Sequence, residues 1–314
     1  MTDDVSALTV RPARPDDRPT LEAWSSSEPV AWVDRARLSA ELGTRNYRYE
    51  WSWIAERGDR PVGRALWWGS ENATRPVTLD CLLVAESESR PDEVGTALIR
   101  AGIADFGTGP GLEFNVDVDV RWTQDPAAVE AVEWRSRAAR AGGFTRSTER
   151  LGFARTDSTP RPEQPRRLAF RPGTDDEFRT LFGAVAPGSL DAHTLAMVAE
   201  QGVDALADDD LRFYLSLPGR RDAWRIATLA DGTTVGFTIA TRTAYDASIS
   251  YLGVLPQYRG HGFVDELLAQ MIHLHHDDGE QRIVGTTDAV NAPMAAAFGR
   301  AGFETTQVRI VHAR

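Results

Sequence analysis

The sequence predicts a mixed α/β protein of two tandem domains, each a mixed, twisted sheet flanked by helices. Short segments near both ends of each half repeat at an offset of 160 residues, since Arg11 corresponds to Arg171 and Arg140 to Arg300, and a middle segment repeats at 173, from Val62 to Val235. So long a period indicates duplicated domains and not a solenoid. Between the copies, residues 157–167 contain three prolines, which disfavour helix and central strand. We therefore expect domains at 1–156 and 168–314, joined by a proline-rich linker.

The second copy gives the clearer pattern of elements. A strand is expected over 166–170, helical segments follow the acidic stretch after Thr174, and two strands form a hairpin that turns at Ala230–Asp231–Gly232. The remaining elements are a strand at 247–255, a glycine-bearing turn at 256–262, a helix at 263–276 with one apolar face, a strand at 282–287, a helix ending at Gly302, and a strand at 306–313. This alternation is typical of a mixed sheet with covering helices.

Composition excludes several function classes. The net charge is -11 and the 35 basic side chains are all arginine, so chemistry that requires lysine is excluded and general binding to nucleic acid is not expected. No apolar run approaches the roughly 20 residues of a membrane span, and the acidic amino end does not resemble a secretory signal. We expect a cytoplasmic location. The single cysteine, Cys81, lies in an apolar run and is expected to be buried.

The turn from Pro256 to Gly262 is the most informative segment. It holds Arg259, Gly260 and Gly262 between an apolar strand and a helix. Backbone N–H groups of such a turn, and of the first helical turn, lack internal partners and can converge on an anion. An ordinary tight turn is the alternative. A Rossmann fingerprint would need a third glycine and a Walker loop would need lysine, and neither is present.

These residues resemble the GCN5-related N-acetyltransferase (GNAT) family. Its pyrophosphate loop, R/Q-x-x-G-x-G/A, follows a V-x-P strand end. Here the strand end is Val254–Pro256 and the loop is "RGHGFV", in which the last position is Val264 where the family has glycine or alanine. The resemblance continues at Asn291 and at Gly302–Phe303. It implies two tandem GNAT-like domains, of which the second keeps the motif.

The resemblance implies an acyltransferase that moves an acetyl group directly from acetyl-CoA to the amine of a small molecule or peptide. The diphosphate would lie on the loop, and pantetheine would pair with the preceding strand. The cofactor-binding residues implied are Leu252, Gly253, Val254, Arg259, Gly260, His261, Gly262, Phe263, Val264, Asn291 and Phe298. The alternative is a non-catalytic acyl-CoA sensor. No metal, membrane or nucleic-acid partner is expected, and the chain is expected to be a monomer or a homodimer.

Catalytic residues are harder to assign. Family members often carry a glutamate base four residues before the V-x-P valine, where this chain has Ser250, and a tyrosine acid where it has Phe298. Ser250, Tyr251 and Asp288 are the polar candidates on nearby segments, and a structural role is the alternative for each.

The first half has a weaker loop. The match keeps only Gly95 and Ala97, and four acidic residues lie close by, namely Glu86, Glu88, Asp92 and Glu93. Because an anion would meet like charge there, we expect weak or no coenzyme binding in this half. Asp80 lies four residues before Val84, at the position of the usual base.

Three further patterns have two interpretations each. Tyr47, Tyr49, Trp51 and Trp53 recur at period two, which predicts one strand face that packs in the core or lines an aromatic slot. The residues 208–210, all aspartate, predict a solvated helix start rather than a carboxylate site. Three histidines, at 273, 275 and 276, are expected near a helix end, with a metal as the alternative.

Overall fold

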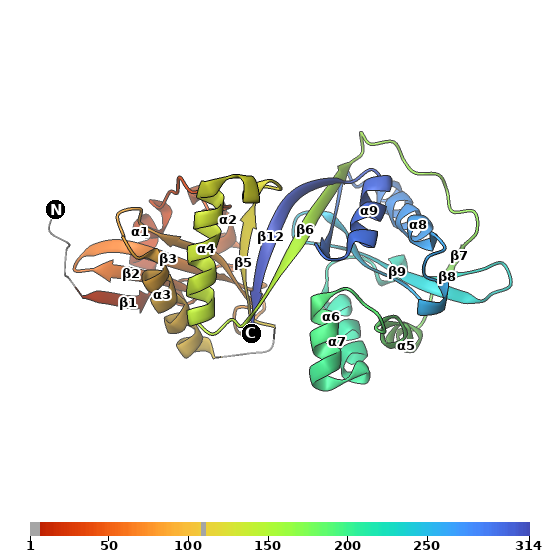
Figure 1. Ribbon diagram of the computed structural model, residues 1–314, viewed down its shortest axis with the longest axis horizontal. Helices are drawn as coiled ribbons and strands as arrows, with labels where there is room; N and C mark the ends of the chain where they lie inside the picture. Colours follow the sequence, from red (N-terminus) through yellow and green to blue (C-terminus); the bar gives the residue numbers. More distant parts are fainter. Residues whose placement is uncertain (1–6, 108–110) are drawn as a thin grey trace. The chain divides into compact units, whose positions relative to one another are not determined.

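The computed structural model describes residues 7–107 and 111–314, and the chain divides into two compact units (Figure 1). The first unit is Met1–Thr148 with Val308–Arg314, and the second is Glu149–Gln307. Each unit has its own hydrophobic core. Both are mixed α/β, as the sequence predicts. No helix in the described part of the chain is long and apolar enough to cross a membrane.

The first unit is a sheet with helices. Its elements are β1 (Leu8–Pro12), α1 (Arg18–Glu22), α2 (Arg35–Gly43), β2 (Ser52–Arg57), β3 (Arg60–Trp68), β4 (Thr78–Val84), α3 (Pro91–Phe106), β5 (Glu113–Val118), α4 (Pro126–Ala141) and the end of β12 (Glu304–Ala313). The strand order is β1-β2-β3-β4-β5-β12. Neighbours are antiparallel except β4 and β5, which are parallel.

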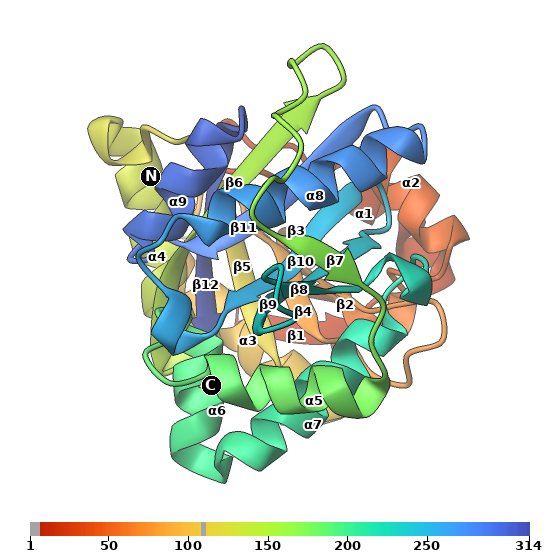
Figure 2. The same cartoon turned by 90° about the vertical axis from the view of Figure 1, so that its right-hand side faces the viewer.

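The second unit repeats this order. Its elements are most of β6 (Arg146–Thr156), β7 (Ala169–Arg171), α5 (Asp175–Val185), α6 (Ala192–Gln201), α7 (Val203–Ser216), β8 (Arg225–Thr228), β9 (Thr234–Arg242), β10 (Ala247–Val254), α8 (Phe263–Asp277), β11 (Arg282–Asp288) and α9 (Ala292–Arg300). The strand order is β7-β8-β9-β10-β11-β6, with β10 and β11 parallel. In Figure 2, α8 and α9 lie on one face of this sheet and α5, α6 and α7 on the other.

The last strand of each repeat pairs in the sheet of the other repeat. Strand β6 pairs with β11 from Thr156↔Arg282 to Arg150↔Asp288, and β12 pairs with β5 from Val308↔Val118 to Ala313↔Glu113. The predicted split at 157–167 places β6 in the first domain and β12 in the second, whereas β6 pairs in the second unit and the end of β12 in the first. Strand pairing is set by hydrogen bonds across the sheet, and a sequence pattern identifies a strand without identifying its partner.

The predicted elements of the second copy are confirmed, with ends that differ by a few residues. The hairpin joins β8 to β9, the helix at 263–276 is α8, and the closing strand is β12. Helix α5 begins with a capping box in which Thr174 and Glu177 each accept from the other's backbone N–H. Cys81 is buried, as predicted.

Two of the local predictions are wrong. Residues 49–51 form a 3₁₀ turn, and β2 begins only at Ser52, so the four aromatic residues do not share one strand face. Tyr47, Trp51 and Trp53 are nevertheless buried, because a period of two cannot distinguish a strand from a well-packed turn that enters one. The aspartates 208–210 lie inside α7 and not at its start.

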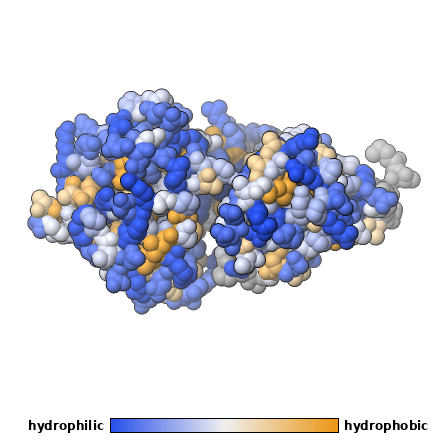
Figure 3. Space-filling view, turned by 180° about the vertical axis from the view of Figure 1, so that it is seen from behind, coloured by the Kyte–Doolittle hydropathy of each residue, from blue (hydrophilic) through white to orange (hydrophobic). Residues whose placement is uncertain are grey.

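The surface is mainly hydrophilic, as the composition indicates. On the face drawn in Figure 3, hydrophobic residues form small separate groups among hydrophilic ones. Exposed hydrophobic side chains of the second unit include Leu195 on α6 and Phe213 on α7, each 52% exposed. Scattered residues of this kind are normal on a folded surface and need no functional explanation.

Candidate active site

The turn between β10 and α8 has the backbone conformation of an anion-binding loop. Gly260 and Gly262 have φ of 79° and 72°, in the left-handed region that favours glycine, and Gly262 is the N-cap of α8. Across the described residues, no acceptor reaches the backbone N–H groups of residues 260–264. A Cβ added at Gly262 would meet no atom closer than 3.9 Å. Five backbone donors without a protein acceptor thus lie at the positive end of a 15-residue helix.

Two arginine side chains hold this turn in place. The Arg259 guanidinium donates to the carbonyl oxygens of Val254 at 3.1 Å, Pro187 at 2.7 Å and Val185 at 2.6 Å, so its side chain joins the turn to the end of α5. Arg167 donates to the carbonyl oxygens of His261 and Gly262 at 2.8 and 3.2 Å. The carbonyl groups of His261 and Gly262 are therefore hydrogen bonded, whereas the N–H groups of residues 260–264 remain available for a ligand.

Glu266, in the first turn of α8, binds the segment of residues 166–168 to this helix. Its carboxylate accepts the backbone N–H groups of Arg166, Arg167 and Leu168 and the Arg167 guanidinium. We expect Glu266→Gln to lower the free energy of unfolding by about 1 kcal/mol, because the charge-assisted bonds become neutral. Urea unfolding would measure this. Asp265→Asn, which loses only a surface ion pair with Arg300, should change stability by less than about 0.5 kcal/mol, and equal effects would contradict the prediction.

The two central strands separate beside this turn. Strand β10 pairs with β11 only from Ala247 to Ile249, opposite Ile283 to Gly285. Further along, residues 250–254 have β9 on one side and no paired strand on the other among the residues that the structure describes. The backbone implied to bind pantetheine, Leu252 to Val254, therefore borders an opening in the sheet. Such an open edge can accept an extended ligand as an added strand.

A β-bulge defines the start of this opening. In the pairing with β9, Ile249 lies opposite Ala240 and Tyr251 opposite Ile239, so Ser250 is the extra residue. Its hydroxyl lies 2.5 Å from that of Thr241. A bulge changes the face to which the following side chains point. Ile249 accordingly packs on the α8 side of the sheet, whereas Tyr251 packs on the α5 and α7 side.

Asn291 and Phe298 have local structural contacts. The Asn291 side chain caps α9 by accepting the Met294 N–H at 3.3 Å. The Phe298 ring is 1% exposed and stacks on Phe153 at 4.6 Å between ring centroids. A Cβ on Gly285 would come within 2.7 Å of this ring, so Phe298 packs directly on the backbone where β10 and β11 last pair. Its ring therefore fills space beside the strands and has no proton to donate.

Asp288 is buried at the end of β11. Its carboxylate accepts from Arg150 Nε at 2.9 Å and from the Ala192 N–H, the first residue of α6, at 2.7 Å. Both oxygens are engaged in contacts that orient β6 and α6. Asp191, the N-cap of α6, lies 3.5 Å from Arg150 and accepts from Thr194. The geometry supports a structural role for Asp288.

We expect Asp288→Asn to lower the free energy of unfolding by about 1–2 kcal/mol, because Arg150 and the α6 amino end lose a charged acceptor. Chemical denaturation at neutral pH would measure the loss. Asp277→Asn is the matched control, since Asp277 makes only a surface ion pair with Arg161. A loss for Asp288→Asn no larger than the control's would contradict this role.

Tyr251 lies in an aromatic group on the other face of the sheet. Its ring stacks on Tyr214 at 5.3 Å and on Phe182 at 5.7 Å between centroids. Burial raises the pKa of both tyrosine hydroxyls, and the charges of Asp210 and Asp191 raise them further. Tyr251 is therefore neutral at physiological pH, and it links the bulge to α7.

Asp210 lies inside α7 and not at the solvated helix start that the sequence predicts. It is 8% exposed and occupies the inward face of α7, three and four residues after the buried Ala207 and Leu206 and four before Tyr214. Among the described residues, no hydrogen bond or ion pair reaches its carboxyl group. Burial, with the charges of Asp191 and Asp209, raises its pKa to about 7. The sequence signal that could have identified Asp210 as inward-facing is its position three and four residues after the apolar Ala207 and Leu206.

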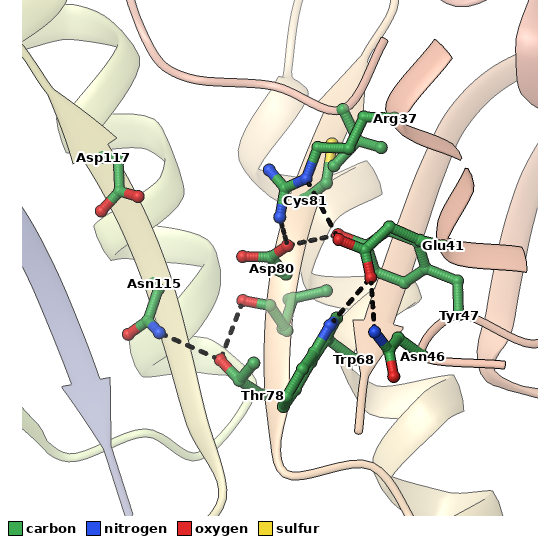
Figure 4. Close-up of polar contacts among 12 residues, drawn as sticks. Arg37, Glu41, Asn46, Tyr47, Trp68, Thr78, Asp80, Cys81, Asn115 and Asp117 are labelled. Carbon is green, nitrogen blue, oxygen red and sulfur yellow. Dashed lines mark hydrogen bonds and ion pairs between the residues drawn. The ribbon is translucent and has the colours of Figure 1, made fainter. Parts of the chain in front are cut away.

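The corresponding bulge of the first unit holds Asp80, in a closed polar cluster. Leu66 pairs with Cys81 and Trp67 with Leu79, so Asp80 is the extra residue. Figure 4 shows its carboxylate accepting from Tyr47 and from Arg37, the latter at 2.6 Å. Beside it, Glu41 accepts from Asn46 at 3.0 Å and Trp68 at 3.2 Å. The donors of Tyr47, Arg37, Asn46 and Trp68 thus bond carboxylates of the same unit, which supports a structural role for Asp80.

The opening between β4 and β5 is filled by side chains of α4. These strands pair only at Thr78 and Leu79. Arg135, 2% exposed, donates to the Leu82 carbonyl oxygen at 3.2 Å and to Glu28 at 2.6 Å. Leu82 lies two residues before Val84, and it therefore corresponds to Leu252, which lies two residues before Val254 in the second unit. Helix α3 begins with Pro91, which has no N–H to offer an anion.

The segment that contains the loop matches a known family. Residues 196–303 match the model described as the acetyltransferase (GNAT) family. The match covers about a third of the chain. Members of this family use acetyl-CoA as cosubstrate, and the fold of the matched segment supports acyl-CoA-dependent acyl transfer in general. No curated protein matches the sequence significantly.

Solved structures show the same fold. A GCN5-related N-acetyltransferase from Sphaerobacter thermophilus is similar at 17% identity with a TM-score of 0.55, over 97% of this chain and 94% of that one. A GCN5-related glucosamine N-acetyltransferase region of a fungal multi-domain GH3 β-N-acetylglucosaminidase gives 14% and 0.56, over 98% of this chain and 38% of that one.

Proposed function

Because residues 196–303 match the acetyltransferase (GNAT) family model, we propose that the chain is an acyl-CoA-dependent N-acyltransferase. It transfers the acetyl group of acetyl-CoA directly to the amine of a small molecule or peptide, at a site in the second unit. The observation that carries this proposal is the set of unpaired N–H groups at 260–264, which lies inside the matched segment. A diphosphate would satisfy these donors and be stabilised by the helix dipole.

The residues around the loop would hold the rest of the coenzyme. Leu252, Gly253 and Val254 would offer backbone groups to the pantetheine arm along the open edge of β10. Asn291, at the entrance to α9, is half-buried and would border the same opening. Phe263 and Val264 begin α8 under the diphosphate, while Arg259 acts through its contacts with Val185 and Pro187 by keeping the loop in place.

The residues of this site can promote acyl transfer by positioning the amine and the thioester. A backbone N–H beyond the bulge would donate to the thioester carbonyl oxygen as it gains negative charge. Holding amine and thioester together supplies much of the rate without a covalent intermediate. Ser250 could accept or relay a proton through its hydroxyl, which is already hydrogen bonded to Thr241.

The first unit has a structural role in this proposal. Arg135 already uses the strand carbonyl that pantetheine would need, and the turn before α3 carries acidic side chains. Opening this site would leave a buried guanidinium without its acceptors, at a cost of several kcal/mol.

A second candidate is a non-catalytic acyl-CoA sensor. Two observations favour it, namely the buried Phe298 ring where the family often has a proton donor, and Ser250 where it often has a base.

A thiol-release assay separates the two functions. Purified protein is given acetyl-CoA and a panel of amines, and both free coenzyme A and acetylated amine are measured. The transferase predicts amine-dependent release with equal amounts of the two products, lost in Gly262→Asp. Acetyl-CoA binding without product from any amine would favour the sensor.

A further inference from the structure

Arg167, at the end of the proline-rich linker, lies beside the loop that precedes α8. Its guanidinium donates to the carbonyl oxygens of His261 and Gly262 at 2.8 and 3.2 Å. It also donates to one carboxylate oxygen of Glu266. Arg167 lies outside the segment 196–303 that matches the family model, so the family motif does not account for these contacts.

Two N–H donors of this guanidinium remain available. An arginine side chain has five N–H groups, one on Nε and two on each Nη. Among the described residues, Nε bonds Glu266, one N–H of Nη1 bonds His261, and one N–H of Nη2 bonds Gly262. Each Nη therefore keeps one N–H for a ligand. The Arg167 side chain is 51% exposed, so a ligand can reach it from solvent.

These donors lie where the loop would receive an anion. A Cβ added at Gly262 would first meet Arg167 Nη2 and the Asp265 carboxylate, each at 3.9 Å. The charge of Asp265 is balanced by Arg300, at 2.7 Å. A diphosphate at the N–H groups of residues 260–264 would thus lie within reach of the Arg167 guanidinium. Arginine binds phosphate groups through strong, charge-assisted hydrogen bonds.

Glu266 orients the Arg167 guanidinium without covering it. One Glu266 carboxylate oxygen accepts the backbone N–H groups of Arg166, Arg167 and Leu168, at 2.9, 2.9 and 3.2 Å. The other oxygen accepts from Arg167 Nε. This ion pair is therefore single and not bidentate, and it leaves both Nη groups directed at the loop. The guanidinium also lies over the Phe263 ring, 4.6 Å from the ring centroid.

The linker is fixed along α8, so Arg167 is in position before a ligand binds. Figure 2 shows the segment between β6 and β7 crossing this helix. The buried Arg155 side chain donates to the Pro160 carbonyl oxygen at 3.0 Å. From α8, His273 Nε2 donates to the Pro162 carbonyl oxygen at 2.9 Å. A donor that is already held in place loses little freedom on binding, which favours affinity.

We propose that Arg167 binds the diphosphate of acetyl-CoA through its two remaining Nη N–H groups. The diphosphate is then held by two kinds of donor, the backbone N–H groups of residues 260–264 and a guanidinium that the linker supplies. The linker is thus part of the coenzyme site and not only a spacer between the repeats. This inference rests on the proposed function and adds a binding residue to the same site.

Arg167→Gln removes the charge, and Arg166→Gln is the matched control. Among the described residues, the Arg166 side chain has only a surface ion pair with Glu163, and it is 78% exposed. Calorimetric titration of each intact protein with acetyl-CoA measures the affinity. We expect Arg167→Gln to weaken binding at least about tenfold, and Arg166→Gln to weaken it less than about twofold.

Two further readouts separate a direct contact from support of the loop. Dephospho-acetyl-CoA lacks the 3′-phosphate but keeps the diphosphate, so Arg167→Gln should weaken its binding as much as that of acetyl-CoA. S-acetylpantetheine lacks the diphosphate, and its binding should not change. As potassium chloride is added, the acetyl-CoA affinity of the wild type should fall more steeply than that of Arg167→Gln, because the variant lacks a charge at the diphosphate.

Arg167→Lys keeps the charge without the planar fork of donors. We expect it to lose less affinity for acetyl-CoA than Arg167→Gln and to keep the salt dependence of the wild type. The same titrations measure both quantities. A loss as large as that of Arg167→Gln, with the weaker salt dependence, would contradict a contact made by charge.

The outcomes separate this inference from the proposed function. A wild type that binds no acetyl-CoA contradicts both. If the wild type binds it and Arg167→Gln binds as tightly as Arg166→Gln, this inference is overturned and the loop site stands. Lost affinity with unchanged salt dependence would mean that Arg167 only holds the loop. A loss confined to acetyl-CoA, with dephospho-acetyl-CoA unaffected, would place the contact at the 3′-phosphate. Either result would overturn the assignment to the diphosphate.

Discussion

Gly262→Asp is expected to weaken acetyl-CoA binding at least about a hundredfold. The new carboxylate would lie beside the N–H groups of 260–264, where the diphosphate would lie. Two unit charges about 4 Å apart repel by roughly 4 kcal/mol near a protein surface, and a hundredfold loss of affinity is about 2.7 kcal/mol. Room for the side chain is not the issue, since no atom lies within 3.9 Å of the Cβ position.

The control variant isolates charge from backbone strain. Gly262→Asn has the same shape and the same left-handed backbone, which asparagine and aspartate tolerate better than other residues with a side chain, but no charge. We expect it to lose much less affinity than Gly262→Asp. A titration of each protein with acetyl-CoA measures this, and equal losses would show that the loop conformation matters and not an anion.

Asp210→Asn is expected to stabilise the folded protein above neutral pH by roughly 2–4 kcal/mol. The pKa of Asp210 rises from 3.8 to about 7 on folding, through burial and then the charges of Asp191 and Asp209, and each pKa unit is about 1.36 kcal/mol. Between these values the folded protein retains a proton that the unfolded chain has released. Stability therefore falls as pH rises from about 4 to about 7.

Burial and the charges of Asp191 and Asp209 set this pH window. Tyr214 and Tyr251, whose pKa values the charge of Asp210 raises, stay neutral across it. Asparagine stays neutral throughout, so the variant should match the wild type near pH 4 and exceed it at pH 8. Urea unfolding at both values measures the difference, and an advantage that does not grow with pH would contradict the assignment.

The sequence predicted the second unit well because its signals are local. Two glycines between a predicted strand and a predicted helix indicate a tight turn with left-handed backbone, as found at 260 and 262. The apolar face of α8 follows from the spacing of its apolar residues alone. The family resemblance rests on this segment, which the family model also matches.

The rest depended on long-range contacts. Arg150 lies 138 residues from Asp288 in sequence, and nothing in "STERLGF" indicates that this strand pairs in the other repeat's sheet. Arg135 reaches Leu82 from α4 and fills the first unit's opening, which no motif reports. Asp210 was hidden in a run of three aspartates whose commonest meaning is solvent exposure. Only the register of α7 separates it from Asp208 and Asp209.

The two units illustrate how one fold supports opposite outcomes. Both have a bulge on the central strand and a parallel pair that separates beyond it. In the first, Asp80 is paired with Tyr47 and Arg37, and the opening is filled. In the second, the backbone N–H groups of residues 260–264 have no acceptor among the described residues. The coenzyme is therefore expected at the loop of the second unit.

The most direct test of the account is the number of acetyl-CoA molecules that one chain binds. Calorimetric titration of the intact protein, with Gly262→Asp beside it, measures this number and its location together. The account predicts one site per chain in the wild type and none in the variant. Two sites, or one site that survives Gly262→Asp, would contradict the assignment of the coenzyme to the second unit.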